Sequence, residues 1–178
     1  MVYKDAMNTH EKTLSEAAGM ADHFGPLSLV MLNDTALKHA WRVNFLANFF
    51  TGPVYRQIEE RFSLTRPEFV ILYCLKHMPG LVARDICLVT GLPKNSISRA
   101  VSDLLGKGLI ERTTGTTDKR AKPLSLTDEG RASLKEVLPV FEIRQKNMRA
   151  ALTDEEQAEF DRLIQKIVYA MPDWVMPE

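Results

Sequence analysis

Residues 93–126 read PKNSISRAVSDLLGKGLIERTTGTTDKRAKPLSL, and this stretch decides the fold. Its first part, 93–107, predicts a helix, because apolar residues recur at helical spacing and Gly108 follows as a stop. Two short strands are predicted next, at 109–112 and 123–126. The polar segment between them contains a glycine, as expected for the loop of a hairpin.

A second short helix is predicted just before this stretch. Residues 82–90 have helical spacing, and Gly91 ends them. A helix pair joined by a tight glycine turn and followed by a hairpin is the order of a winged helix-turn-helix. The predicted fold is therefore mainly α with a small β-hairpin wing.

The 93–107 helix has a polar face that fits duplex DNA. Arg and Lys can pair with guanine and Asn with adenine, and a recognition helix presents its N-terminal residues to the bases. An ordinary solvated helix face would have a similar composition. The outward-facing candidates are Lys94, Asn95, Ser96, Ser98, Arg99 and Ser102.

The loop between the two strands favours the DNA interpretation. It carries Asp118, Lys119, Arg120 and Lys122, and a thin basic hairpin suits the negative potential of the minor groove. The whole chain has 23 basic and 23 acidic residues, but residues 81–125 contain eight basic and four acidic ones, a net charge of +4. Local rather than total charge therefore predicts double-stranded DNA as a partner.

Three motifs resemble those of the MarR family of bacterial regulators. The first is the run Leu104-Leu105-Gly106-Lys107-Gly108-Leu109-Ile110-Glu111-Arg112. The second is Asp118-Lys119-Arg120, and the third is Leu124-Ser125-Leu126-Thr127-Asp128-Glu129-Gly130. They occur in the family's order and spacing, and the flanking helices extend the resemblance to residues 34–168.

This resemblance implies a triangular homodimer in which the terminal helices of the two subunits intertwine. Recognition helices would enter successive major grooves of a pseudo-palindromic operator, most simply as a repressor. Arg120 would enter the minor groove, and Asp118 would pair with a nearby base to hold the wing. Two departures stand out: Pro93 replaces the Ser that often caps the recognition helix, and Thr replaces the usual acidic and Pro residues of the wing.

Long helices are predicted on both sides of the winged helix-turn-helix. The first, 34–62, has Asn33 or Asp34 as cap, a kink at Gly52-Pro53, and an apolar stripe at intervals of four that should pack on a partner face. The stripe consists of Leu37, Trp41, Phe45 and Phe49.

Further capping signals mark the other helices. Thr65 and Glu68 form a capping box ahead of a helix that Pro79-Gly80 stops, and Thr127 caps a helix running to about residue 151 with a bend at Pro139. A second capping box, Thr153-Asp154-Glu155-Glu156, begins a last helix that Pro172 ends.

Four segments follow from this pattern. Residues 1–32 form a partly ordered N-terminal extension, 33–64 a dimerisation helix, 65–127 the DNA-binding lobe, and 128–172 the C-terminal dimerisation helices. The terminal helices are apolar on one face and far apart in sequence, so pairing across a two-fold axis would bury a long seam. The alternative is that both fold back on their own subunit.

The resemblance also implies an effector site between the dimer base and the DNA-binding lobe, which would take a small aromatic or phenolic compound. Polar groups beside aromatic ones suit such a ligand. Packing in the core is the alternative role for Trp41. The candidates are His39, Trp41, Arg42, Asn44, Asn48 and Tyr73.

Other classes of function find no support in the sequence. There is no phosphate loop, no Gly-x-Ser-x-Gly and no metal-ligand spacing among the four histidines, so we expect neither an enzyme, a metal site nor a cofactor. Cys74 and Cys87 lie in apolar stretches, which suits buried free thiols. With no secretory signal and no membrane-length apolar run, the sequence predicts a cytoplasmic protein. A winged-helix module that binds protein rather than DNA is the main alternative.

Overall fold

The computed structural model describes residue 15 and residues 17–113 and 122–175. Within these ranges, residues 17–24 are helical and the chain then forms a series of helices interrupted by one hairpin. In chain order the elements are α2 (Leu27–Leu29), the π-helix η1 (Val30–Asp34), α3 (Lys38–Phe62), α4 (Arg66–His77), α5 (Ala83–Thr90), α6 (Lys94–Gly106), β1 (Ile110–Arg112), β2 (Leu124–Leu126), α7 (Asp128–Arg149), α8 (Asp154–Tyr169) and α9 (Met171–Trp174).

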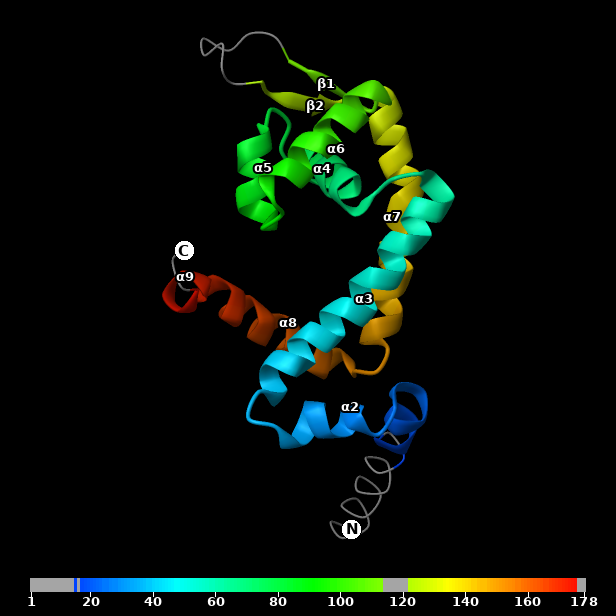
Figure 1. The fold of residues 1–178 in the computed structure, drawn as a ribbon, viewed down its shortest axis with the longest axis vertical. Helices are drawn as coiled ribbons and strands as arrows, with labels where there is room; N and C mark the ends of the chain where they lie inside the picture. Colours follow the sequence, from blue (N-terminus) through cyan, green and yellow to red (C-terminus); the bar gives the residue numbers. More distant parts are fainter. Residues whose placement is uncertain (1–14, 16, 114–121, 176–178) are drawn as a thin grey trace. The chain divides into compact units, whose positions relative to one another are not determined.

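The predicted winged helix-turn-helix is confirmed. Helices α4, α5 and α6 gather beside the antiparallel β1–β2 hairpin, in which Ile110 pairs with Leu126 (Figure 1). Gly91 ends α5 with φ +65° and Gly108 follows α6 with φ +68°, a left-handed conformation that glycine adopts without strain. These two glycines make the turns on either side of α6.

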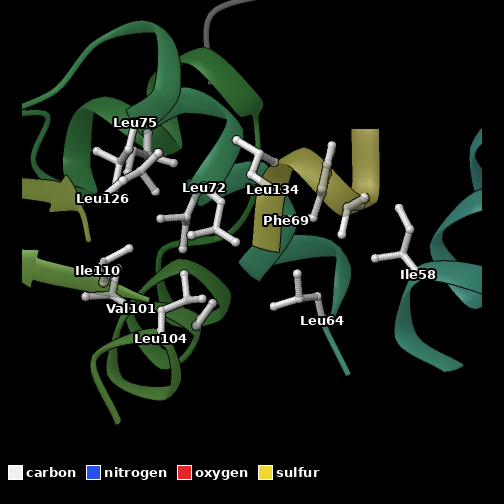
Figure 2. Close-up of a cluster of buried hydrophobic side chains, with 14 of the residues drawn as sticks. Ile58, Leu64, Phe69, Leu72, Leu75, Val101, Leu104, Ile110, Leu126 and Leu134 are labelled. Carbon is white, nitrogen blue, oxygen red and sulfur yellow. The ribbon is translucent and has the colours of Figure 1, made fainter. Parts of the chain in front are cut away.

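A single apolar core holds this lobe together. Side chains from α4, α6, both strands and α7 converge on it, among them Leu72, Leu104, Ile110 and Leu134 (Figure 2). Every buried hydrophobic residue in the described ranges falls between residues 54 and 140. The core therefore belongs to the winged helix-turn-helix and the ends of the helices that flank it.

A hydrogen bond connects the N-cap of α7 to the turn after α6. The Thr127 hydroxyl donates to the Gly108 carbonyl oxygen at 2.7 Å and accepts from the Gly130 amide at 3.0 Å. A Cβ atom on Gly130 would lie 2.0 Å from the Leu109 carbonyl oxygen. The glycine of the third motif is thus required by close backbone approach.

The described residues fall into two compact units, one up to Gly52 and one from Pro53, and the boundary falls inside α3. In the first unit the Phe24 ring lies 5.0 Å from the Phe45 ring and 4.7 Å from the Phe49 ring. Arg42 donates to the Leu32 carbonyl oxygen at 2.8 Å. The end of the N-terminal extension is therefore ordered against the first half of α3.

The start of α3 differs from the sequence prediction. The helix begins at Lys38 rather than at residue 34, because Thr35 adopts an extended backbone (φ −96°, ψ 155°) that separates it from η1. Asn33 does not cap α3; its side-chain oxygen accepts a bond from Arg42 instead. The helix continues through Pro53.

Two apolar faces of the chain have little cover. Of the predicted stripe, Leu37, which precedes α3, and Trp41 and Phe49, which lie on it, are exposed, and Phe45 is half-buried. Helix α8 has no buried residue, and its apolar face is 44–56% exposed. That face consists of Leu163, Ile164, Ile167 and Val168.

The C-terminal helices begin where their caps predict. Thr153 caps α8, with its amide donating to the Glu156 carboxylate at 2.9 Å, and α7 continues through Pro139. Pro172 does not end α8: the helix stops at Tyr169, and Pro172 lies in the short α9. Of the helices described, none is long and apolar enough to cross a membrane.

Candidate nucleic-acid interface

Helix α6 buries its apolar residues on one face and exposes its polar residues on the other, as the sequence predicts. Ile97, Ala100, Val101 and Leu104 are buried and anchor the helix in the core. The opposite face is open to solvent along its N-terminal half. It presents Lys94, Asn95, Ser98, Arg99 and Ser102, with Ser96 half-buried beside them.

The N-terminus of α6 has no side-chain cap from Pro93, which occupies the N-cap position. The Asn95 side-chain oxygen instead accepts from the Ser96 amide at 3.0 Å. A bidentate contact with adenine uses both the oxygen and the nitrogen of an Asn side chain. This bond uses one of the two acceptor sites of the Asn95 oxygen and leaves the second site and the side-chain NH2 for a base.

The base of the wing is held by backbone hydrogen bonds. The Thr113 amide donates to the Pro123 carbonyl oxygen at 3.0 Å, and Leu124 exchanges bonds with the 80–81 segment at 2.8 and 3.0 Å. Lys122 is exposed where the described part of the loop resumes. The other wing candidates, Asp118, Lys119 and Arg120, lie outside the described residues.

Lys107, one of the eight basic residues counted in residues 81–125, is engaged in contacts within the protein. Lys107 donates to the Glu68 carboxylate and, at 2.8 Å, to the Ser63 carbonyl oxygen. Arg84 and Arg112 are exposed, although Arg84 lies 3.7 Å from Asp85. The net charge counted from the sequence therefore overstates the positive charge available to DNA by the contribution of Lys107.

A cleft of about 830 Å³ opens in the unit formed by residues 53–178, between α4, α5, α7 and the end of α3. Tyr55, Phe69, Tyr73 and Phe141 line it. The Phe69 ring stacks on Phe141 at 4.6 Å and on Tyr73 at 5.8 Å, which makes a continuous aromatic wall. Burial raises the pKa of the Tyr55 hydroxyl more than the nearby Arg66 lowers it, so Tyr55 is a neutral phenol at neutral pH.

Of the predicted effector residues, Tyr73 lines this cleft. The others lie on the first half of α3, in the unit formed by residues 1–52, and are exposed: His39, Trp41, Arg42, Asn44 and Asn48. The sequence did not single out Phe69 or Phe141, because their helical spacing looks like ordinary core.

Both cysteines are half-buried, and Cys74 lines the cleft. Burial raises the pKa of the Cys74 thiol, which keeps it protonated at neutral pH and a poor nucleophile. The described residues contain no group of three or more His, Cys, Asp or Glu placed to hold a metal ion.

Comparison with known proteins gives the same fold and family. A profile described as MarR family matches residues 62–121. The transcriptional regulator PetP of Rhodobacter capsulatus is 30% identical over 135 residues, which cover 74% of this chain and 79% of PetP. The transcriptional repressor Rv2887 of Mycobacterium tuberculosis is 30% identical over 105 residues, 59% of this chain and 76% of Rv2887. The chain belongs to the MarR family.

Solved structures of MarR proteins agree with this assignment. Rv2887 in complex with salicylic acid superposes with a TM-score of 0.59 at 26% identity, over 76% of this chain and 98% of that one. The PcaV regulator of Streptomyces coelicolor, in complex with its natural ligand, gives 0.60 at 26% identity over 78% and 95%. This MarR-family chain is accordingly a transcription regulator of winged helix-turn-helix type and not an enzyme.

Proposed function

We propose that this protein is a homodimeric repressor that binds a pseudo-palindromic DNA operator and leaves it when a small aromatic effector binds. The observation that carries the proposal is the polar face of α6, which stands free of the core in its N-terminal half. Rv2887 has also been solved in complex with DNA, at 24% identity and a TM-score of 0.56.

Specific reading of DNA requires side chains that reach base edges as well as phosphates. On α6, Arg99 is exposed one turn after Asn95, a spacing that places both on the same helix face. Arg99 is the candidate for guanine, and Lys94, at the first position of the helix, is the candidate for a phosphate. Asp118, Lys119, Arg120 and Lys122 are the proposed minor-groove contacts of the wing.

Dimerisation would cover the two apolar faces that the single chain leaves open. The exposed stripe of α3 and the exposed face of α8 together contain Trp41, Ile164 and Ile167, which are 39–56% exposed. Full burial of such a side chain contributes roughly 1.5–3 kcal/mol, so covering the part still exposed contributes about half of that for each. A two-fold dimer would then place its recognition helices ~34 Å apart, one turn of duplex.

The aromatic cleft beside α4 and α5 is the proposed effector site, with Tyr73 as its contact from the predicted set. Rv2887 binds salicylic acid and p-aminosalicylic acid, which are small aromatic ligands. The cleft touches α5, the first helix of the helix-turn-helix. A ligand there could therefore change how α5 and α6 meet the DNA. His39, Trp41, Arg42, Asn44 and Asn48 stay as further candidates on α3.

Enrichment of bound sequences from a random duplex pool, at near-physiological salt, tests the proposal. An inverted repeat with half-sites one turn apart would support a dimeric, sequence-reading regulator. A folded dimer that enriches no sequence, and whose DNA binding shows no salt dependence, would favour the protein-binding winged helix instead.

A further inference from the structure

The charge of the cleft differs from that expected for a carboxylate ligand. Its lining includes two carboxylates, Asp85 on α5 and Glu142 on α7, against a single lysine, Lys76 at the end of α4. His77 also belongs to the lining. The salicylic acid that Rv2887 binds is itself an anion at neutral pH.

The two carboxylates are not equally available. An Asp85 oxygen accepts weakly from the Val82 amide at 3.4 Å, and the other oxygen lies 3.7 Å from Arg84. Glu142 is exposed and lines the same cleft as Phe141, whose ring belongs to the aromatic wall. Glu142 is therefore the carboxylate best placed to meet a ligand seated on that wall.

The positive groups nearby do not reverse this charge. Lys76 is exposed and sits in the last turn of α4, where a cation offsets the negative end of the helix dipole. Arg66 lies outside the cleft lining, with its guanidinium over the Tyr55 ring at 5.2 Å. The same ring thus already holds a cation on its face, an interaction that aromatic rings make through their quadrupole.

From the aromatic wall and the two carboxylates we infer that the cleft takes a flat aromatic cation, such as a quaternary or protonated ring amine, rather than an aromatic carboxylate. The ligand ring would lie against Tyr73 and Phe141, the more exposed rings of the wall, because Phe69 is only 5% exposed, and the positive charge would face Glu142. The inference rests on the proposed function only in treating this cleft as the effector site. It assigns the ligand's charge, which the family does not fix.

Calorimetry on the full-length protein with three bicyclic probes tests the inference: N-methylquinolinium, 1-naphthalenemethanol and 1-naphthoate, with charges of +1, 0 and −1. We expect the quinolinium to bind at least about tenfold more tightly than the naphthoate, since a desolvated cation–π contact and one facing carboxylate reach that size. Tighter binding of the naphthoate would overturn the inference.

Glu142→Gln should weaken quinolinium binding about tenfold and leave the neutral alcohol unchanged, because only the charge is removed. The control is Glu136→Gln, an exposed residue of α7 outside the cleft lining, which should change neither. Equal quinolinium affinity in wild type and Glu142→Gln would overturn the assignment. Thermal melts would check that both variants are folded.

The operator assay separates this inference from the proposed function. A protein that enriches no operator but prefers the quinolinium through Glu142 overturns the proposed function alone. A protein that binds an inverted repeat but prefers the naphthoate overturns the ligand assignment alone.

Discussion

Glu68 and Lys107, 39 residues apart in sequence, form an ion pair that joins the start of α4 to the end of α6, with Nζ 2.5 Å from Oε1. Glu68 is 1% exposed and is the one buried charged residue in the described ranges. Its other oxygen accepts from the Thr65 amide at 2.7 Å and the Thr65 hydroxyl at 2.9 Å. The pair therefore fixes where the recognition helix ends relative to α4.

Lys107→Met should destabilise the protein by about 3 kcal/mol, because removal of one partner leaves a buried carboxylate without its counter-charge. The value is at the lower end of the range for buried pairs since the Lys107 side chain is 39% exposed. Urea unfolding measures it. Arg162→Met, which breaks the exposed Arg162–Glu159 pair on α8, is the control and should change the free energy of unfolding far less, because water screens an exposed pair. Equal losses in the two variants would contradict the structural role of the buried pair.

The same pair should make stability depend on pH. Burial raises the pKa of Glu68, but hydrogen bonds from Lys107 and Thr65 outweigh it and hold the pKa below its ordinary 4.5. A carboxyl whose pKa is lower in the folded state stabilises the fold above its unfolded pKa, and this contribution is lost as pH falls through the folded pKa. The unfolding free energy of wild type should therefore fall more steeply below about pH 4.5 than that of Glu68→Gln. Parallel curves of unfolding free energy against pH for the two proteins would show that Glu68 does not cause the loss of stability in acid.

Gly130→Ala should destabilise the protein strongly even though alanine is the better helix former by about 1 kcal/mol. Its Cβ would meet the Leu109 carbonyl oxygen at 2.0 Å, and backbone on both sides prevents either atom from moving away. Gly106→Ala is the matched control, because Gly106 is also helical and has nothing within 4 Å of its added Cβ. Thermal unfolding should show a lower Tm for Gly130→Ala and an unchanged or higher one for Gly106→Ala. The reverse order would refute the close approach.

The sequence predicts local features well because their causes are local. Gly91 and Gly108 end helices through their own backbone freedom, and the Thr153 capping box needs residues only three apart. The ion pair of Lys107 with Glu68 depends on the folded arrangement of α4 and α6, so the sequence could assign Glu68 only to its cap. The start of α3 at Lys38 is set by the extended Thr35, which no capping signal marks.

The two candidate sites also differ in how far the sequence predicts them. The outward face of α6 follows from helical periodicity, and the structure places those residues as expected. The cleft is different, because it combines residues of four helices that are distant in sequence. Tyr73 was a candidate for its polar aromatic side chain, whereas Phe141 and Glu142 have no local pattern that distinguishes them from core and surface.

Arg99→Ala should lower operator affinity by about 1–3 kcal/mol and relax preference at one base-pair position of each half-site. Lys94→Ala should instead weaken all sequences alike and reduce the slope of log K against log salt by about 1, as a phosphate contact does. Fluorescence anisotropy on matched and substituted duplexes measures both. Lys135→Ala, on the exposed face of α7, should leave both unchanged. A uniform loss in Arg99→Ala would make Arg99 a phosphate contact too.

Ile167→Glu should prevent the proposed dimer from forming and leave the protein monomeric. Ile167 is 56% exposed in the single chain, so a charge there costs little in the monomer but a great deal inside an apolar seam. Sedimentation velocity measures the change, and Lys166→Gln on the same helix, which also lowers the charge by one, is the control. Operator binding should weaken when dimerisation is lost. A dimer binds two half-sites together and so gains an effective concentration that a single recognition helix lacks. If Ile167→Glu stays dimeric, the exposed face of α8 is not the seam, and the stripe of α3 around Trp41 becomes the surface to test.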